Sequence, residues 1–228
     1  MAGEIVLVGG EEFRQGCEEM DREVMKASGQ APARVVVIPT AAVTGPAKAA
    51  NDGVRHFEAL GGESRPLMVL DRSHADDAVM AQQLQDVGVI YFTGGNPDHL
   101  LETLKGSLFM EAINRALAGG AVVAGSSAGA MAMGSWMRRP SNGEWVQGLG
   151  VAPGVAVLPH HENSDPEETS RRLSEEAPAG VTVLGIDARS GCLGGGGSWR
   201  VVGSGNVTVY QGEGWTVYKP GEGFSTGG

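Results

Sequence analysis

The chain is short of basic residues, of cysteine and of long apolar runs. Lysine and arginine number 17 against 27 aspartates and glutamates, a formal net charge of −10 over 228 residues. A negatively charged surface opposes binding to nucleic acid and to anionic membranes. Charges or glycines interrupt every apolar run well short of the ~18 residues that a membrane-spanning helix needs. We therefore expect neither nucleic acid nor a membrane among the partners.

The two cysteines, Cys17 and Cys192, have no metal-site spacing, and a disulfide framework is not expected. The N-terminal segment also lacks the basic and apolar stretches of a secretory signal. Both thiols are therefore predicted to be reduced, in a cytoplasmic protein. Residues 9–12, which read GGEE, do not form the G-x-G-x-x-G motif of dinucleotide binding. No cofactor and no metal ion are predicted.

Short apolar runs alternate with helical patterns over the first two thirds of the chain. Predicted strands occupy residues 4–8, 34–38, 66–70, 87–92 and 121–124, and predicted helices residues 13–27, 46–60, 79–84 and 97–117. Apolar strands separated by helices indicate a parallel sheet that is covered on both faces. The expected fold is α/β, flavodoxin-like and doubly wound, with its ligand site at the carboxyl ends of the strands.

The pattern changes after residue 150. Two further strands are predicted at 155–158 and 181–184, with a helix at 166–176 between them; short runs at 199–202, 207–210 and 215–218 predict an antiparallel C-terminal extension. No linker or internal repeat is visible, so residues 1–228 are expected to form one domain. The extension could form the contact of a homodimer, although no residue in the sequence requires a dimer.

The segment with the clearest chemistry is residues 122–131, VVAGSSAGAM. A strand runs into a G-x-S-x-G turn and then into a helix, which is the context of a nucleophile elbow with Ser127 at its tip. The helix N-terminus would favour negative charge that develops at this serine. The alternative is an ordinary strand-to-helix turn in which the serine caps the helix.

A nucleophilic serine needs a base. His160 and His161 directly follow the strand at 155–158, at the same sheet edge as Ser127, and one of the two is the expected base. His56 and His74 are expected to be solvated. Amides at this edge would hold the oxyanion, one from Gly95 in the GGNP turn at 94–97 and one from Ala128.

Asp187 ends the strand run at 183–186, at the same sheet edge, and it either orients the histidine or serves as a turn residue. The resulting order is Ser, His, acid. An α/β-hydrolase, by contrast, has the order Ser, acid, His, and would need Glu144 as its acid here.

The segments GGN at 94–96, GSSAGA at 125–130 and PH at 159–160 together resemble the peptidase S51 family, which contains aspartyl dipeptidase (peptidase E) and cyanophycinase. The resemblance covers nearly the whole chain, including VVIPTA at 36–41 and GID at 185–187. It implies a fold similar to class I glutamine amidotransferases, with serine replacing their cysteine. It also implies Ser127 as the nucleophile and His160, which directly follows the proline, as the base.

The sequence departs from the family at the acid. The register of the resemblance puts the family glutamate at Ala188. Asp187, one residue earlier, is expected to replace it, and Glu162 is a more distant candidate.

A second departure concerns specificity. The family arginine that selects acidic N-terminal residues falls at Thr169 or Ser170. Arg171 and Arg172, together with Asn96 in the GGNP turn, are then the expected substrate-binding residues, and a strict preference for aspartate is not expected.

The resulting hypothesis is a serine peptidase that hydrolyses short peptides, as a dipeptidase or exopeptidase, through an acyl-enzyme on Ser127. Two alternatives remain open. The same residues would also serve an amidase or esterase acting on other substrates, and a chain without a family acid would also fit a catalytically silent, ligand-binding relative.

Overall fold

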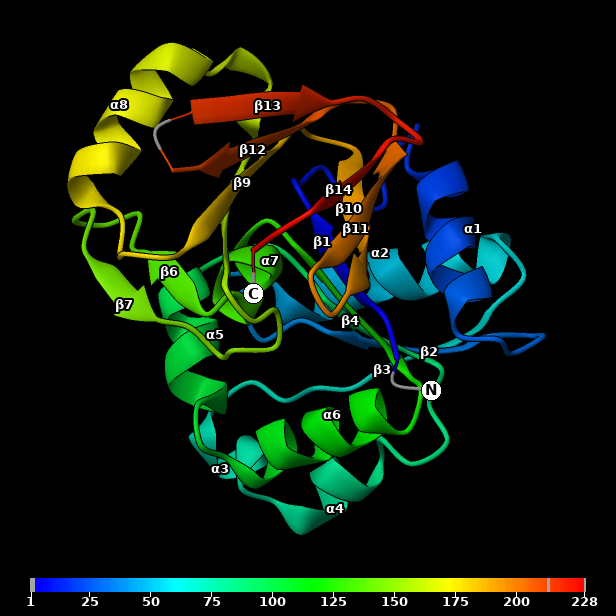
Figure 1. The fold of residues 1–228 in the computed structure, drawn as a ribbon. Helices are drawn as coiled ribbons and strands as arrows, with labels where there is room; N and C mark the ends of the chain where they lie inside the picture. Colours follow the sequence, from blue (N-terminus) through cyan, green and yellow to red (C-terminus); the bar gives the residue numbers. More distant parts are fainter. Residues whose placement is uncertain (1–2, 213, 228) are drawn as a thin grey trace.

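A central eight-stranded sheet organises the computed structural model, which describes residues 3–212 and 214–227 (Figure 1). Its strand order is β14-β11-β10-β1-β5-β4-β2-β3. The parallel strands are β1 (Ile5–Val8), β5 (Val122–Ser126), β4 (Val89–Phe92), β2 (Arg34–Ile38) and β3 (Glu63–Pro66). The antiparallel strands β10 (Ser190–Gly195), β11 (Ser198–Gly203) and β14 (Gly223–Ser225) extend the sheet beyond β1.

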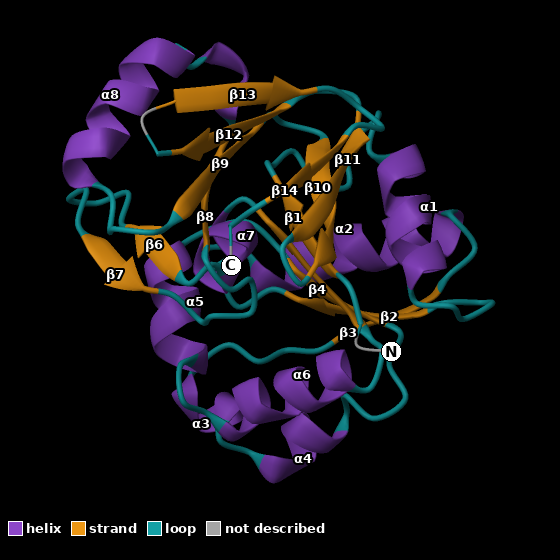
Figure 2. Ribbon diagram, viewed as in Figure 1, coloured by secondary structure: helices purple, strands orange, loops and turns teal. Residues whose placement is uncertain are grey.

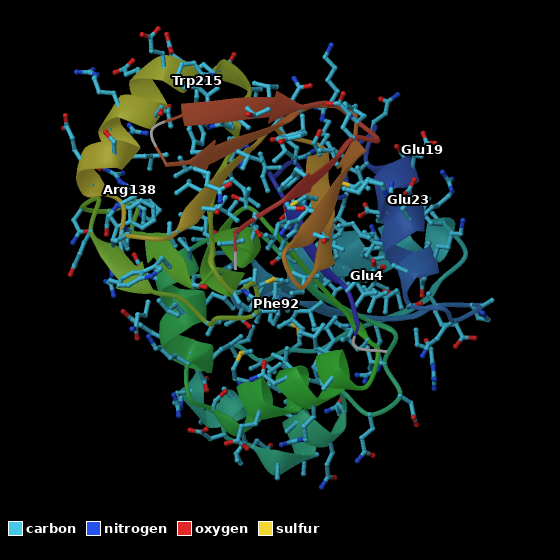
Figure 3. The ribbon with its side chains drawn as sticks, in the orientation of Figure 1. Glu4, Glu19, Glu23, Phe92, Arg138 and Trp215 are labelled. Carbon is cyan, nitrogen blue, oxygen red and sulfur yellow. The ribbon has the colours of Figure 1, made fainter. Side chains whose placement is uncertain are left out.

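Helices cover both faces of this sheet, as the apolar strands predict (Figure 2). On one face, α1 (Glu18–Ala27) and α2 (Pro46–Ala59) bury side chains such as Met20 and Phe57 against Val37 and Tyr91. On the other face, α5 (Pro97–Leu104), α6 (Leu108–Ala118) and α7 (Ala128–Met133) enclose Phe92 in the interior (Figure 3). Burial of apolar side chains at about 25 cal/mol per Å² on both faces is what holds the layers together. The predicted doubly wound α/β fold is confirmed.

A second sheet of four strands lies beside the first, in the order β13-β12-β9-β8. It contains β8 (Val155–Pro159), β9 (Thr182–Ile186), β12 (Val207–Gln211) and β13 (Gly214–Tyr218), and α8 (Pro166–Glu176) packs against it. The hairpin of β6 (Trp136–Arg138) and β7 (Trp145–Gln147) lies next to it. The predicted antiparallel extension is therefore divided between two sheets, because β10, β11 and β14 join the first sheet and β12 and β13 the second.

Three element predictions need correction. Strand β3 lies at Glu63–Pro66 rather than at 66–70, since it pairs in register with β2. The helix predicted at 97–117 is two helices, because the chain turns at Gly106 with a φ of +69°. Helix α1 begins only at Glu18, because the preceding residues form turns with positive φ at Glu11 and Phe13.

The remaining short elements are α3 (Arg72–Ala75), α4 (Ala78–Gln82) and the 3-10 turn at His161–Asn163. None of the helices in the described ranges is long and apolar enough to cross a membrane.

Candidate active site

Ser127 occupies a sharp turn between β5 and α7. Its backbone has φ 48° and ψ −108°, a conformation that costs a non-glycine residue roughly 1–3 kcal/mol. The flanking glycines are sterically required, because a Cβ on Gly125 would lie 2.7 Å from the carbonyl carbon of Gly129 and one on Gly129 2.8 Å from the Phe92 carbonyl oxygen. The strand, strained serine and helix that a nucleophile elbow needs are thus all present.

His160 follows β8 of the second sheet and faces Ser127, which follows β5 of the first sheet. Its Nε2 lies 3.3 Å from Ser127 Oγ, a long hydrogen bond of the kind common in substrate-free sites. The residue has a left-handed backbone, with φ 53° and ψ 46°, and its N–H donates to the Gly9 carbonyl oxygen at 2.9 Å. The ring lies directly over Gly10, where a Cβ would come within 2.2 Å of its Cε1.

His161 points away from this pair. Its ring is buried and its Nε2 lies 2.6 Å from Tyr210 Oη, inside the second sheet. Burial lowers the pKa of His161, which favours a neutral structural imidazole. Of the two histidines that the sequence left open, the structure brings His160 to Ser127.

Asp187 does not reach His160 in the part of the chain that the structure describes. Its Oδ2 accepts a hydrogen bond from the Asn206 N–H at 2.9 Å, in the turn that joins the two sheets. Glu162 instead brings its carboxylate to the place where the resemblance puts the family acid, since its Oε2 accepts from the Ala188 N–H at 2.9 Å.

The pKa of Glu162 reflects this position. Burial acts to raise the pKa, but hydrogen bonds from the amides of Ala188 and Glu162 itself, with His160 and His161 nearby, hold it below the ordinary value. Glu162 is therefore an anion beside His160 at neutral pH.

Glu12 is a site residue that sequence reasoning missed. Its Oε1 accepts from the Gly94 N–H at 2.7 Å and its Oε2 from the Ser126 hydroxyl at 2.8 Å. The carboxylate thus joins the GGNP turn to the nucleophile turn. The available signal is an acidic residue just beyond a buried strand that ends in the paired glycines Gly9 and Gly10.

The two predicted oxyanion amides lie on either side of this junction. Gly95 has a φ of +140°, and a Cβ there would come within 2.1 Å of the Ala41 carbonyl oxygen, so only glycine fits. Ala128 is the first residue of α7, where N–H groups have no intrahelical acceptor. Neither the Gly95 N–H nor the Ala128 N–H donates a hydrogen bond to another segment of the described chain, so both are free to bind an oxyanion.

Ser127 and His160 line a cavity of about 900 Å³. Three cationic side chains, Arg14, Lys48 and Arg55, share it with the acidic residues Glu11, Glu12 and Asp52. Lys48 is paired with Asp52, whereas neither arginine has an ion-pair partner among the described residues. The cavity therefore offers both signs of charge beside the serine.

The predicted substrate-binding residues lie outside this cavity. Arg171 and Arg172 are exposed on α8 and do not line it. Asn96 lines a neighbouring cavity of about 520 Å³, and its Oδ1 caps α5 by accepting from the His99 N–H. The arginines of the cavity wall come from the turn before α1 and from α2.

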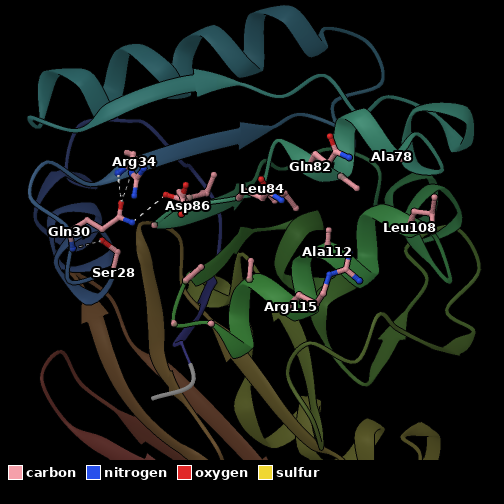
Figure 4. A pocket seen from close by; sticks show the side chains of 18 residues that line it. Ser28, Gln30, Arg34, Ala78, Gln82, Leu84, Asp86, Leu108, Ala112 and Arg115 are labelled. Atoms are coloured by element: carbon pink, nitrogen blue, oxygen red, sulfur yellow. Dashed lines mark hydrogen bonds between the residues drawn. The ribbon is translucent and has the colours of Figure 1, made fainter.

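Another cavity, of about 680 Å³, lies at the opposite, amino-terminal edge of the sheet (Figure 4). Gln30 accepts a hydrogen bond from Arg34 there and donates one to the Asp86 carbonyl oxygen, and neither histidine nor cysteine lines the cavity. Across residues 3–212 and 214–227, no three His, Cys, Asp or Glu side chains are grouped to hold a metal ion.

Comparison with known proteins identifies the class. A crystal structure of a peptidase from an acI-B1 Actinobacterium is similar over 99% of this chain and 97% of that one, with a TM-score of 0.86 and 27% identity. A Listeria monocytogenes EGD-e structure that carries the name peptidase E shares the fold, with a TM-score of 0.62 and 19% identity over 96% of this chain and 99% of that one. The chain is a peptidase, a hydrolase of α/β fold. It belongs to peptidase family S51, whose sequence profile matches residues 5–193, and the resemblance seen in the sequence is confirmed.

Proposed function

We propose that this peptidase hydrolyses short peptides by a serine mechanism in which Ser127 is the nucleophile and His160 the general base. The observation that carries the proposal is the 3.3 Å approach of His160 Nε2 to the hydroxyl of a strained serine at the end of a parallel strand. An adjacent imidazole is what activates an otherwise weak serine nucleophile.

In the first step, His160 Nε2 takes the proton of Ser127 as Oγ attacks the scissile carbonyl carbon. The amides of Gly95 and Ala128 stabilise the resulting oxyanion, a contribution worth about 3–4 kcal/mol per donor in serine proteases. His160 then gives its proton to the leaving amine, and the acyl group stays on Ser127. Water, activated by the same imidazole, releases the acid and restores the serine.

Glu162 is the acid that we assign to this mechanism, in place of Asp187. Its ionised carboxylate is two residues from His160 in the sequence and accepts from the Ala188 N–H, at the position of the family acid, whereas Asp187 Oδ2 accepts from the Asn206 N–H in the turn between the sheets. A negative charge near the imidazole favours the imidazolium that forms during attack.

The size and charge of the cavity favour short substrates. At about 900 Å³, it falls within the usual range of small-ligand sites and would enclose a peptide of a few residues. The unpaired guanidinium groups of Arg14 and Arg55 are suited to a carboxylate, which every short peptide carries at its C-terminus.

The experiment is hydrolysis of a dipeptide and tripeptide panel, varied at the N-terminal residue, by wild type and by Ser127→Ala. We expect kcat to fall by about 10⁴-fold or more in the variant, with unchanged folding, as when other serine hydrolases lose their nucleophile. Ser174→Ala, which alters an exposed serine of α8, is the matched control and should retain full activity. Equal cleavage by Ser127→Ala would refute the serine mechanism, and activity confined to non-peptide amides or esters would refute the substrate assignment.

A further inference from the structure

The Glu12 carboxylate lies beside the nucleophile without a cation of its own. Its two hydrogen bonds come from neutral donors, the Gly94 amide and the Ser126 hydroxyl, and it has no ion-pair partner among the described residues. The side chain is half-buried and lines the same cavity as Ser127 and His160. A carboxylate has about four acceptor sites, so two remain for a ligand.

The distance to the reacting serine is short. A Cβ placed on Gly94 would lie 3.0 Å from Glu12 Oε1 and 3.4 Å from Ser127 Cβ, so both side chains border one point in space. In a peptide attacked by Ser127, the backbone nitrogen of the acylating residue lies two bonds from the scissile carbonyl carbon, through Cα. When that residue is the first of the peptide, this nitrogen is a free α-ammonium group.

The other acidic residues of the cavity are less suited to this role. Asp52 is paired with Lys48, and Glu11 is exposed, with its Oε2 3.8 Å from Arg189. Glu12, by contrast, is held in place by two neutral donors and has no ion-pair partner among the described residues. A preorganised, uncompensated anion in a partly buried wall is complementary to an ammonium group.

We propose that Glu12 binds the α-ammonium group of the substrate, so that the acyl-enzyme on Ser127 carries one free N-terminal residue. The assignment rests on the proposed serine mechanism and adds its specificity: the enzyme removes the first residue of short, unblocked peptides. Glu12 then acts as a specificity-determining residue, and its bonds to Gly94 and Ser126 set the distance between the ammonium group and the oxyanion site.

The test compares the best peptide of the panel with its N-acetylated form and with the form that lacks the amino group. We expect wild type to favour the free peptide by about 10- to 100-fold in kcat/KM, the range of a hydrogen bond to a charged group. In Glu12→Gln this ratio should approach one, whatever the overall loss of rate. In Glu11→Gln, the matched control from the adjacent position, the ratio should equal that of wild type.

Because the readout is a ratio, a variant that merely loosens the site lowers both rates and leaves the ratio unchanged. An unchanged ratio in Glu12→Gln overturns the assignment, as does equal cleavage of free and acetylated peptides by wild type. Glu12→Asp, which keeps the charge on a shorter arm, should give a ratio between the other two. If Glu12→Gln does not fold, Glu12→Asp decides, and a ratio equal to that of wild type overturns the proposal.

The outcomes separate the two proposals. Failure of any Ser127-dependent peptide cleavage removes the serine peptidase, and with it the role of Glu12. Cleavage that depends on Ser127 but ignores the amino group leaves the serine peptidase standing and removes only the assignment of Glu12.

Discussion

Carboxylates that reach backbone amides determine much of the chemistry at the residue scale. Glu162 accepts a hydrogen bond from the Ala188 N–H, and Glu12 accepts one from the Gly94 N–H. Each carboxylate therefore binds the backbone of a segment that is distant in the sequence. A family position that has lost its side chain, such as Ala188, can thus be served by a carboxylate 26 residues away in the sequence.

The acid assignment predicts unequal effects of two isosteric variants. Glu162→Gln should lower kcat by about 10- to 100-fold with little change in KM, because an exposed acid orients and stabilises the imidazole less strongly than a buried one. Asp187→Asn should change kcat by less than about threefold, since an amide oxygen can still accept from the Asn206 N–H. Steady-state kinetics on the best peptide measure both, and the reverse order of effects would return the role to Asp187.

Ser127 and His160 could be predicted because each stands in a local motif at a strand end. Glu12 and the buried pair of Asp21 and His56 could not, because their partners lie far away in the sequence, 114 residues in the case of Ser126. His56 was expected to be solvated, and its exposed fraction of 10% corrects that expectation, since α1 brings the carboxylate of Asp21 to its ring. Arg14 and Arg55 could not be predicted as site residues either, since only the fold brings them to the cavity.

At the scale of elements, the end of β1 supports the base. The Gly9 carbonyl holds the His160 backbone, and the absence of a side chain on Gly10 leaves room for the imidazole. The parallel strands other than β3, and the helix at 166–176, were predictable from apolar runs and turn residues. The split of the C-terminal strands between two sheets was not, because pairing partners are chosen by packing rather than by the strands' own sequences.

Gly10→Ala is therefore expected to displace His160 and lower kcat by about 100-fold, the cost of a misplaced catalytic group. Gly61→Ala is a matched control, because it places a Cβ on another glycine of positive φ, +92°, with nothing within 4 Å. Both variants should lose about 1 kcal/mol of stability from the backbone conformation. Only Gly10→Ala should lose activity, and normal peptide hydrolysis by this variant would contradict the role given to the end of β1.

At the scale of the whole molecule, a buried pair of titratable side chains joins the two helices on one face of the sheet. Asp21 on α1 is 0% exposed and its Oδ2 lies 2.7 Å from His56 Nε2 on α2. Burial raises the pKa of Asp21, and the bond from His56 acts in the opposite direction. Asp71 and His74 form a similar pair at 3.5 Å, but both are well exposed.

Removing one partner of the buried pair should cost far more than removing one of the exposed pair. His56→Ala should lower the free energy of unfolding at pH 7.5 by about 3 kcal/mol, since it leaves the buried Asp21 carboxyl without the hydrogen bond from His56. His74→Ala should change it by less than about 1 kcal/mol. Urea denaturation of each variant beside wild type measures both, and equal effects would contradict the argument.

The loss in His56→Ala should also depend on pH. A carboxyl whose pKa is raised in the folded state takes up its proton there before the unfolded chain does, for which the value is about 3.9. The variant should therefore recover stability relative to wild type as the pH falls through the raised pKa of Asp21. The same denaturation series at pH 7.5, 6.5 and 5.5 checks the sign, and a loss that grows on acidification would contradict it.

The two halves of the Ser127–His160 pair are also completed at different times as the chain is made. The turn that holds Ser127 lies between β5, which ends at Ser126, and α7, which ends at Met133. The sheet that carries His160 holds β9 between β8 and β12, and β12 ends only at Gln211. A chain truncated after β9 would contain the serine turn but lack β12, which flanks the sheet that carries His160, so we expect such a chain to be inactive in peptide hydrolysis.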